Sequence, residues 1–367
     1  MSDGRTMQTT KTPNEDPAAK SGETPVLSVR HLTTSFRTDS GVVTAVDDVT
    51  FDLNAGETLG IVGESGCGKT VTSKSIMRLL PEHVTSYGDK TEVIYGGVNI
   101  NRAKERAMRK IRGDKIAMIF QEPMTSLNPV FTVGWQLDEA LKYHTKLNRK
   151  ERRDRAVEML RLVEIPNPEE RVKEYPHQLS GGMRQRVMIA IALCCEPDIL
   201  IADEPTTALD VTIQAQILDL MAGLKEKLDT AIMLITHDLG VVAQVCDRVM
   251  VMYAGRVIET GSVTDIFHRP QHPYTRALLE SIPKRGEKTR GKKLATIPGI
   301  VPSLTDLPPG CRFEDRCVCS DGSRCGLEEP ELEGEIHGRS VRCFYPLGTE
   351  RERPANLTVG SIAGEAE

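Results

Sequence analysis

The chain has 367 residues, of which 47 are Lys or Arg and 52 are Asp or Glu, giving a net charge of −5. This length can bury one large core plus a smaller domain, and the charge gives no electrostatic case for a nucleic-acid partner. No stretch approaches the ~20 apolar residues of a membrane-spanning helix, and the N-terminus lacks the apolar core of a signal peptide. We therefore expect a cytosolic protein that reaches a membrane only through partners.

Apolar runs along the chain predict an α/β fold. Residues 1–24 are polar and rich in Thr, Lys, Glu and Pro, and we expect them to be disordered. The alternation over residues 26–53 predicts antiparallel strands. Between residues 122 and 177 the pattern becomes largely helical, and it is amphipathic over 133–163. A mostly parallel sheet is predicted from five short apolar runs: 59–62, 115–120, 199–203, 232–236 and 249–253.

A glycine-rich octapeptide follows the first of these runs and precedes a helical pattern over residues 71–80. It reads Gly63, Glu64, Ser65, Gly66, Cys67, Gly68, Lys69 and Thr70. The glycines let successive N–H groups point at one anion, and the positive end of the following helix favours phosphate charge. Lys69 is expected to reach the β- and γ-phosphates of ATP, and the Thr70 hydroxyl to bind Mg²⁺. The alternative is a glycine-rich turn that binds no nucleotide.

Two adjacent acids lie at the end of the apolar run 199–203. Asp203 is expected to hold Mg²⁺ through water, and Glu204 lies where a base could polarise an attacking water. Both acids could instead cap the next turn. We favour the chemical role, because a strand ending in two acids beside a phosphate loop suits metal-assisted phosphoryl transfer.

A second glycine pair opens a second predicted helix over residues 183–194. The motif reads Leu179, Ser180, Gly181, Gly182, Met183, Arg184, Gln185 and Arg186. It predicts a second anion site at a helix N-terminus. Because residues 63–70 already cradle the phosphates of one nucleotide, we infer that Ser180 and Gly182 serve a nucleotide held by another subunit.

This motif resembles the signature of ATP-binding-cassette (ABC) ATPases, a family in which two subunits sandwich two ATP molecules head to tail. The resemblance covers residues 25–270 and implies a P-loop ATPase with a RecA-like core and an antiparallel β subdomain. It also implies a helical subdomain at about 122–185, whose groove receives a short helix from a transmembrane subunit.

The resemblance further implies a role for single residues. Gln121 would touch Mg²⁺ and the attacking water, and His237 would contact the γ-phosphate. Phe36 would stack on adenine, and Asp210 of Ala208-Leu209-Asp210 would lie in the loop that crosses between the two sites. Gly181 and Gln185 are assigned to the nucleotide together with the rest of the signature.

Two further stretches, residues 121–129 and 268–275, resemble the peptide-importer branch of this family. That branch implies uptake of dipeptides or oligopeptides, with nickel or another small solute as the alternative cargo. The implied partners are a second ABC ATPase subunit, commonly a paralogue, two transmembrane permease subunits and an extracytoplasmic peptide-binding protein. The chain would then act at the cytoplasmic face of the inner membrane. The run His272-Pro273-Tyr274 itself predicts a helix start, since Pro presets φ there.

Five of the nine cysteines fall in the C-terminal region, which we place at residues 271–346 and follow with a flexible tail at 347–367. A cytosolic chain keeps thiols reduced, so a thiolate cluster here favours a metal or iron–sulfur centre over disulfides. The run of residues 310–317 resembles the C-terminal segment of peptide-importer ATPases, which implies a [4Fe–4S] cluster. Structural zinc and unligated thiols remain alternatives. The implied ligands are Cys311, Cys317, Cys325 and Cys343, with Cys319 as an alternative.

Cys67 differs from the other thiols because it lies inside the phosphate loop near a helix N-terminus. Its thiolate should be favoured there, and we expect maleimide to label it unless ATP protects it. Two other functions remain open at this point. A soluble ABC ATPase of DNA repair or translation would need long coiled coils or two cassettes, and the sequence has neither. A metal- or redox-sensing regulator would make the cysteine tail the main site.

Overall fold

A computed structural model describes residues 24–39, 41–121, 126–207, 210–282, 296–335 and 338–349. The predicted disorder of residues 1–24 and 347–367 therefore falls almost wholly outside the described residues. The strands are β1 (Leu27–Thr38), β2 (Gly41–Leu53), β3 (Thr58–Val62), β4 (Thr85–Tyr87), β5 (Glu92–Tyr95), β6 (Val98–Asn99), β7 (Ile116–Ile119), β8 (Ile199–Asp203), β9 (Ala231–Ile235), β10 (Arg248–Tyr253), β11 (Arg256–Ser262), β12 (Glu333–Gly334) and β13 (Ser340–Val341). The α-helices are α1 (Lys69–Ile76), α2 (Glu105–Ile111), α4 (Val133–His144), α5 (Arg149–Leu162), α6 (Pro168–Arg171), α7 (Gly181–Leu193), α8 (Val211–Leu228), α9 (Leu239–Val245), α10 (Val263–His268), α11 (Pro273–Glu280) and α12 (Arg324–Leu327).

The larger sheet has the strand order β12-β13-β11-β10-β3-β9-β8-β7. Neighbours from β7 to β10 along this order are parallel, and β11, β13 and β12 are added antiparallel. Every residue of β3, β8 and β9 is buried, which is why these strands read as continuous apolar runs. The prediction of a mostly parallel α/β sheet is confirmed.

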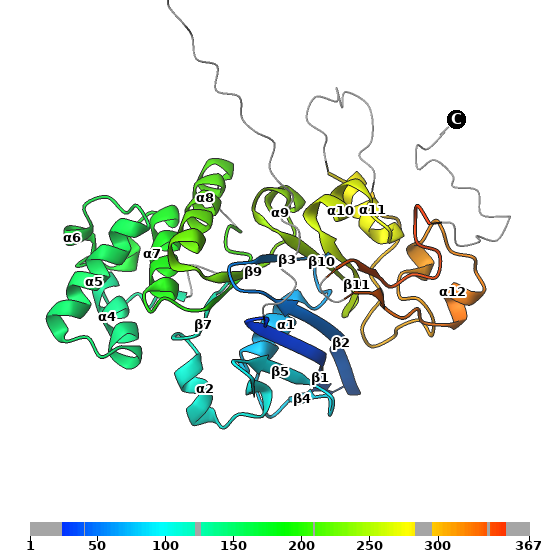
Figure 1. The fold of residues 1–367 in the computed structure, drawn as a ribbon, viewed down its shortest axis with the longest axis horizontal. Coiled ribbons are helices and arrows are strands. Elements are labelled where there is room, and N and C mark those ends of the chain that lie inside the picture. Colours follow the sequence, from blue (N-terminus) through cyan, green and yellow to red (C-terminus); the bar gives the residue numbers. More distant parts are fainter. Residues whose placement is uncertain are drawn as a thin grey trace, which may run out of the picture.

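The smaller sheet is antiparallel and has the order β2-β1-β5-β6, with β4 pairing to β1. In the long β1–β2 hairpin Leu27 pairs with Leu53 and Phe36 pairs with Val43, as the alternation predicted. Figure 1 shows this sheet below the larger one, with α1 between them and α8, α9, α10 and α11 on the opposite side of the larger sheet. The phosphate-loop helix α1 therefore lies between the two sheets.

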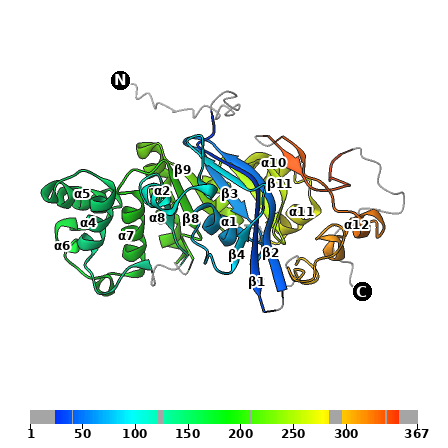
Figure 2. The same ribbon diagram turned by 90° about the horizontal axis from the view of Figure 1, so that it is seen from below.

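A helical segment of α4, α5, α6 and α7 forms one end of the molecule, as both views in Figures 1 and 2 show. The predicted helical stretch over 133–163 is confirmed as two helices, α4 and α5. Thr132 caps α4, and Asn148 forms a capping box with Glu151 at the start of α5. The Asn148 cap marks the place where the stretch divides into two helices.

The C-terminal segment lies at the opposite end of the molecule from the helical segment (Figure 2). It returns to the larger sheet through β13, where Val341 pairs with Glu259 and Ser340 with Thr260 of β11. Pro273 occupies the first turn of α11 and the His272 side chain caps it, which confirms the predicted helix start. Among the helices that the structure describes, none has both the length and the apolar character needed to cross a membrane.

Candidate functional site

The glycine-rich octapeptide forms a loop between β3 and α1, as the sequence predicted. Gly63, Gly66 and Gly68 have φ values of 154°, 80° and 102°, where side chains other than glycine are strained. A Cβ on Gly63 would lie 2.2 Å from the Met252 carbonyl oxygen, and one on Gly68 would lie 2.7 Å from that of Ala45. Neighbouring backbone thus fixes where the loop runs, and glycine is the residue that fits.

The Lys69 ammonium lies at the centre of this loop. Its Nζ donates to the carbonyl oxygens of Gly63, at 2.6 Å, and Glu64, at 3.0 Å. Beside it, the Thr70 hydroxyl donates to the Asp203 carboxylate at 3.1 Å. Burial raises the pKa of Asp203, and the Thr70 hydrogen bond opposes that shift. A cation, a hydroxyl and a buried carboxylate therefore meet where a Mg²⁺–triphosphate could be held.

Glu204 is the centre of a second group of side chains. Its carboxylate accepts hydrogen bonds from Gln121 Nε2, at 3.0 Å, and from Thr207 Oγ1, at 2.9 Å, and lies 3.3 Å from His237 Nδ1. Gln121, Glu204 and His237 follow the parallel strands β7, β8 and β9, so the carboxyl edge of the sheet gathers them. The sequence predicted three of these four residues and missed Thr207.

The environment of Glu204 keeps its carboxylate charged. Burial alone would raise its pKa, but hydrogen bonds from Thr207 and His237, together with the Lys69 charge, lower it below its usual value. Its backbone has a φ of 48°, an uncommon conformation for a glutamate. Such backbone strain is concentrated at functional sites. The arrangement can orient a water molecule and accept its proton.

The second glycine pair starts α7, as predicted. Ser180 is exposed, and its hydroxyl accepts from the Met183 N–H at 3.3 Å. Gly181 is exposed as well, and a Cβ added there would meet nothing within 4 Å. Within the described residues no hydrogen bond joins the turn of residues 180–182 to the phosphate loop of the same chain. The turn is therefore open to another molecule.

The assignment of Gln185 to the nucleotide is wrong. Its side chain is fully buried, and Nε2 donates to the carbonyl oxygen of Pro205, the residue after Glu204. A nucleotide on the surface cannot reach it. The side chain instead links the helix that begins at Ser180 to the backbone beside Glu204.

The remaining predicted contacts lie on the surface or on β1. Asp210 is exposed at the start of α8, while its neighbours Ala208 and Leu209 lie outside the described residues. Phe36 is half-buried on β1, across from Thr85 of β4. Neither side chain is brought to Lys69 or Glu204 by a contact that the structure describes.

The prediction that Cys67 is a reactive thiolate is also wrong. The residue has 0% exposure, and burial raises the pKa of its thiol in spite of the nearby Lys69 charge. A position near a helix N-terminus lowers a thiol pKa only where the sulfur keeps polar or charged surroundings. Here the sulfur packs into the core beneath the loop.

The Glu64 side chain and N–H contact the C-terminal region. Its carboxylate forms two hydrogen bonds with the guanidinium of Arg316, and its N–H donates to the Tyr274 hydroxyl oxygen at 2.9 Å. The sequence assigned Glu64 to the cofactor with the rest of the loop. The structure instead connects it to the C-terminal region.

The five C-terminal cysteines line one small cavity together with His272 and Phe313. Burial raises the pKa of Cys311, that of Cys325 to about 11 and that of Cys343 to about 12. All nine cysteines are free thiols. Across the described ranges, however, no group of three or more His, Cys, Asp or Glu side chains is arranged to hold a metal ion. The thiols converge, but they are not in ligand geometry.

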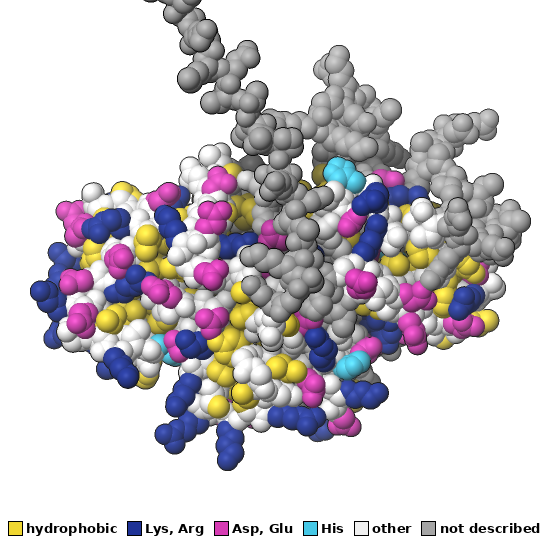
Figure 3. Space-filling model, in the orientation of Figure 1, with side chains coloured by type: hydrophobic (Ala, Val, Ile, Leu, Met, Phe, Trp, Pro, Cys, Tyr) yellow, Lys and Arg dark blue, Asp and Glu magenta, His cyan; other side chains and the backbone are white. Residues whose placement is uncertain are grey.

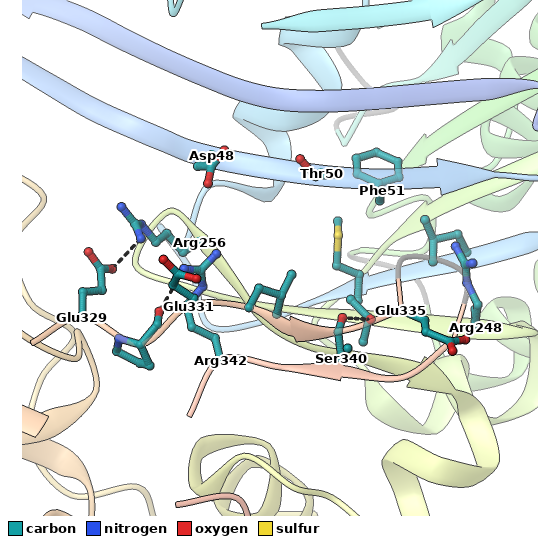
Figure 4. Close-up of a pocket in the computed structure, with 16 residues that line it drawn as sticks. Asp48, Thr50, Phe51, Arg248, Arg256, Glu329, Glu331, Glu335, Ser340 and Arg342 are labelled. Atoms are coloured by element: carbon teal, nitrogen blue, oxygen red, sulfur yellow. Dashed lines mark hydrogen bonds and ion pairs between the residues drawn. The ribbon is translucent and has the colours of Figure 1, made fainter. Parts of the chain in front are cut away.

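A cavity of about 580 Å³ lies away from these groups, between β2 and the C-terminal strands (Figure 4). Its arginines already have partners. Arg248 pairs with Glu57 at 3.1 Å, and Arg256 with Glu329 at 2.9 Å. Arg342 donates to backbone carbonyls at 2.9 and 3.1 Å. We assign no ligand to this cavity.

Comparisons with known proteins agree with this geometry. The ABC transporter family model matches residues 46–207, and that of the oligopeptide/dipeptide transporter C-terminal region matches residues 258–325. The dipeptide transport ATP-binding protein DppD of Bacillus subtilis (strain 168) is 57% identical over 292 residues, covering 80% of this chain and 86% of its own length. DppD of Escherichia coli (strain K12) is 48% identical over 322 residues, covering 88% and 97%. Among solved structures, the dimeric post-hydrolysis state of the cassette MJ0796 bound to ADP and Pi has a TM-score of 0.58 and 29% identity, covering 65% of this chain and 98% of that one.

Proposed function

Because this chain belongs to the family of ATP-binding proteins of peptide ABC transporters, we propose that it hydrolyses ATP to drive uptake of dipeptides or oligopeptides. The observation that carries the chemistry is the group of Gln121, Thr207 and His237 around Glu204, next to Lys69 and Thr70. The cargo class follows the relatives and the C-terminal region. Nickel or another small solute is the alternative cargo.

Each residue of the site has a separate task in this mechanism. Lys69 binds the β- and γ-phosphates with its ammonium, while loop N–H groups bind the other phosphate oxygens. Thr70 and Asp203 would hold Mg²⁺, which neutralises charge on the phosphate oxygens when it is bound. Glu204 accepts a proton from the attacking water, and Gln121 orients that water. His237 donates a hydrogen bond to the γ-phosphate.

Among the described residues, the turn of residues 180–182 makes no hydrogen bond to the phosphate loop of its own chain. We assign Ser180, Gly181 and Gly182 of a second ATPase subunit to the γ-phosphate, with Asp210 in the loop between the two sites. The exposure of Ser180 and Gly181 supports this, and the similar cassette MJ0796 is dimeric with ADP and Pi bound. The second subunit is a copy of this chain or a paralogue.

The remaining partners are two permease subunits and an extracytoplasmic peptide-binding protein. The chain would contact the permeases through the helical segment and act at the cytoplasmic face of the membrane. Figure 3 shows Lys, Arg, Asp and Glu side chains mixed over the visible face, without a large basic patch. That mixture, like the net charge of −5, favours protein partners over nucleic acid.

We further propose that four of the C-terminal thiols hold a [4Fe–4S] cluster, with structural zinc as the alternative. The convergence of Cys311, Cys317, Cys319, Cys325 and Cys343 on one cavity supports a thiolate site. Metal binding would need deprotonation of these thiols and small movements of their side chains. Iron, sulfide and zinc analysis of anaerobically purified protein tests this. Comparing Cys319→Ser with Cys325→Ser identifies the third ligand, and metal-free protein with full activity would refute the site.

Co-purification from native membranes followed by transport tests the function as a whole. The tagged chain should bring down a second ATPase and two permeases. In liposomes with the binding protein, the complex should take up labelled dipeptide only with ATP, and a Glu204→Gln complex should not. Uptake of Ni²⁺ in place of peptide would identify nickel, the alternative, as the cargo. Failure to recover any membrane partner would contradict the transport function.

A further inference from the structure

Side chains of the C-terminal region form hydrogen bonds to the phosphate loop. The Arg316 guanidinium faces the Glu64 carboxylate with both terminal nitrogens, at 2.7 and 3.0 Å. Only 4% of the Arg316 side chain is exposed. Two parallel N–H···O bonds in a buried setting form the strongest kind of side-chain pair, and they fix orientation as well as distance.

A second contact holds the backbone of the same residue. The Tyr274 hydroxyl oxygen accepts the Glu64 N–H at 2.9 Å, and Tyr274 has 0% exposure. Its ring packs against Tyr253 and Phe313 with centroid distances of 4.8 and 5.3 Å. Glu64 is thus held at its side chain and at its amide by two residues that follow it by more than 200 positions.

The Arg316 side chain is itself held in place. Its Nε donates to the Pro298 carbonyl at 2.8 Å, and one terminal nitrogen also contacts the Tyr253 hydroxyl at 3.2 Å. The hydrogen bonds to Glu64 raise the pKa of Arg316, so its guanidinium stays charged. The ion pair between Arg316 and Glu64 is therefore held in one geometry.

The backbone at Glu64 connects these contacts to Lys69, the phosphate-binding lysine. The carbonyl oxygens of Gly63 and Glu64 are the two groups that hold the Lys69 ammonium. Rotation of the peptides around Glu64 would move both acceptors and the N–H groups that line the loop. A chain of contacts thus runs from Arg316 through Glu64 to Lys69.

We propose that Arg316 and Tyr274 are positioning residues for ATP, setting the conformation of the phosphate loop from the C-terminal region. The proposal rests on the proposed ATPase function of the loop. It gives the C-terminal region a task at the nucleotide site, although its residues need not touch the nucleotide. An ion pair that only joins two parts of the fold would change stability but would leave the ATP affinity of the folded protein intact.

The test is a set of variants assayed for ATP hydrolysis, nucleotide binding and melting temperature. Arg316→Ala should raise the KM and the Kd for ATP about 10-fold, within the usual range of coupling between sites, with a smaller change in kcat. Arg316→Lys should recover part of that loss because it can keep one of the two bonds. Arg324→Ala is the control: it removes a surface arginine of the same region, which pairs with Glu328 away from the loop.

Two milder variants keep the test valid if Arg316→Ala does not fold. Glu64→Gln keeps the shape of the side chain and loses its charge, and Tyr274→Phe loses only the hydroxyl. Each should raise the KM for ATP about threefold to tenfold. The double variant Glu64→Gln Arg316→Ala should bind ATP as tightly as the single variant that has the lower affinity for ATP. An unchanged ATP affinity in folded variants, or additive losses in the double variant, would overturn the proposal. A wild-type protein that binds no ATP would instead overturn the proposed function.

Discussion

Replacing Glu204 by glutamine separates nucleotide binding from turnover. The carboxylate accepts hydrogen bonds from Gln121 and Thr207 on one oxygen and faces His237 with the other. The amide oxygen of Gln can keep the first two contacts, and its NH₂ group can donate to His237 Nδ1. These bonds fall from about 1.5–3 kcal/mol each, typical of charged partners, to about 0.5–1.5 kcal/mol each. We therefore expect a folded variant that loses at most about 4 kcal/mol of stability, and less because Gln121 and His237 are exposed to solvent.

Turnover should fall far more than stability, because the amide cannot accept the proton of the attacking water. Loss of a general base costs about 10²- to 10⁴-fold in rate. Phosphate release under saturating Mg²⁺–ATP measures the rate, and binding of a fluorescent ATP analogue should remain within about threefold of wild type. Residual hydrolysis within tenfold of wild type would remove Glu204 from the role of base.

The matched control is Glu196→Gln. Glu196 also has a positive φ, of 53°, and also pairs with a side chain, Arg155 at 2.6 Å. It follows α7 at the surface and has no contact with the phosphate loop among the described residues. Its replacement should leave the rate unchanged. A similar loss in both variants would indicate a general effect on folding.

Two further predictions follow from the pKa shifts. In the folded protein at pH 7.5, Cys67 should react with maleimide far more slowly than a thiol that is free in solution, with or without ATP. In urea it should be labelled fully, as followed by mass spectrometry. Rapid labelling of the native protein would contradict its burial. Burial would raise the pKa of Asp47, but Arg256 and Arg312 lower it below 3.8, so the folded state holds this proton less tightly than the unfolded state. The stability that Asp47 contributes is present above pH ~4 and is lost as pH falls through the lowered pKa. Asp47→Asn should therefore flatten the decline of urea-unfolding free energy below pH 4, and an unchanged slope would refute this assignment.

Much of the site could be predicted because its residues follow buried parallel strands. Such strands appear in the sequence as short apolar runs, and their carboxyl ends must meet at one edge of the sheet. That rule places Gln121, Glu204 and His237 together without any distance information. Thr207 carried no such signal, since a threonine in a turn is ordinary.

Other features depend on contacts that a single sequence does not reveal. The pairing of Glu64 with Arg316 joins residues 252 positions apart, and the patterns that contain them, residues 63–70 and 310–317, give no sign of this contact. Cys67 was misjudged because its place near a helix N-terminus says nothing of which way the sulfur points. Gln185 was misjudged for a similar reason: its side chain lies on the buried face of α7.

The central claim is that hydrolysis needs the Ser180 turn of a neighbouring cassette. The most direct measurement is the ATPase rate per chain over a hundredfold dilution, with the oligomeric state followed by light scattering. The rate should fall as dimers dissociate, and Ser180→Arg should abolish it at every concentration while single-chain ATP binding persists. A constant rate from monomers, unaffected by Ser180→Arg, would contradict the account.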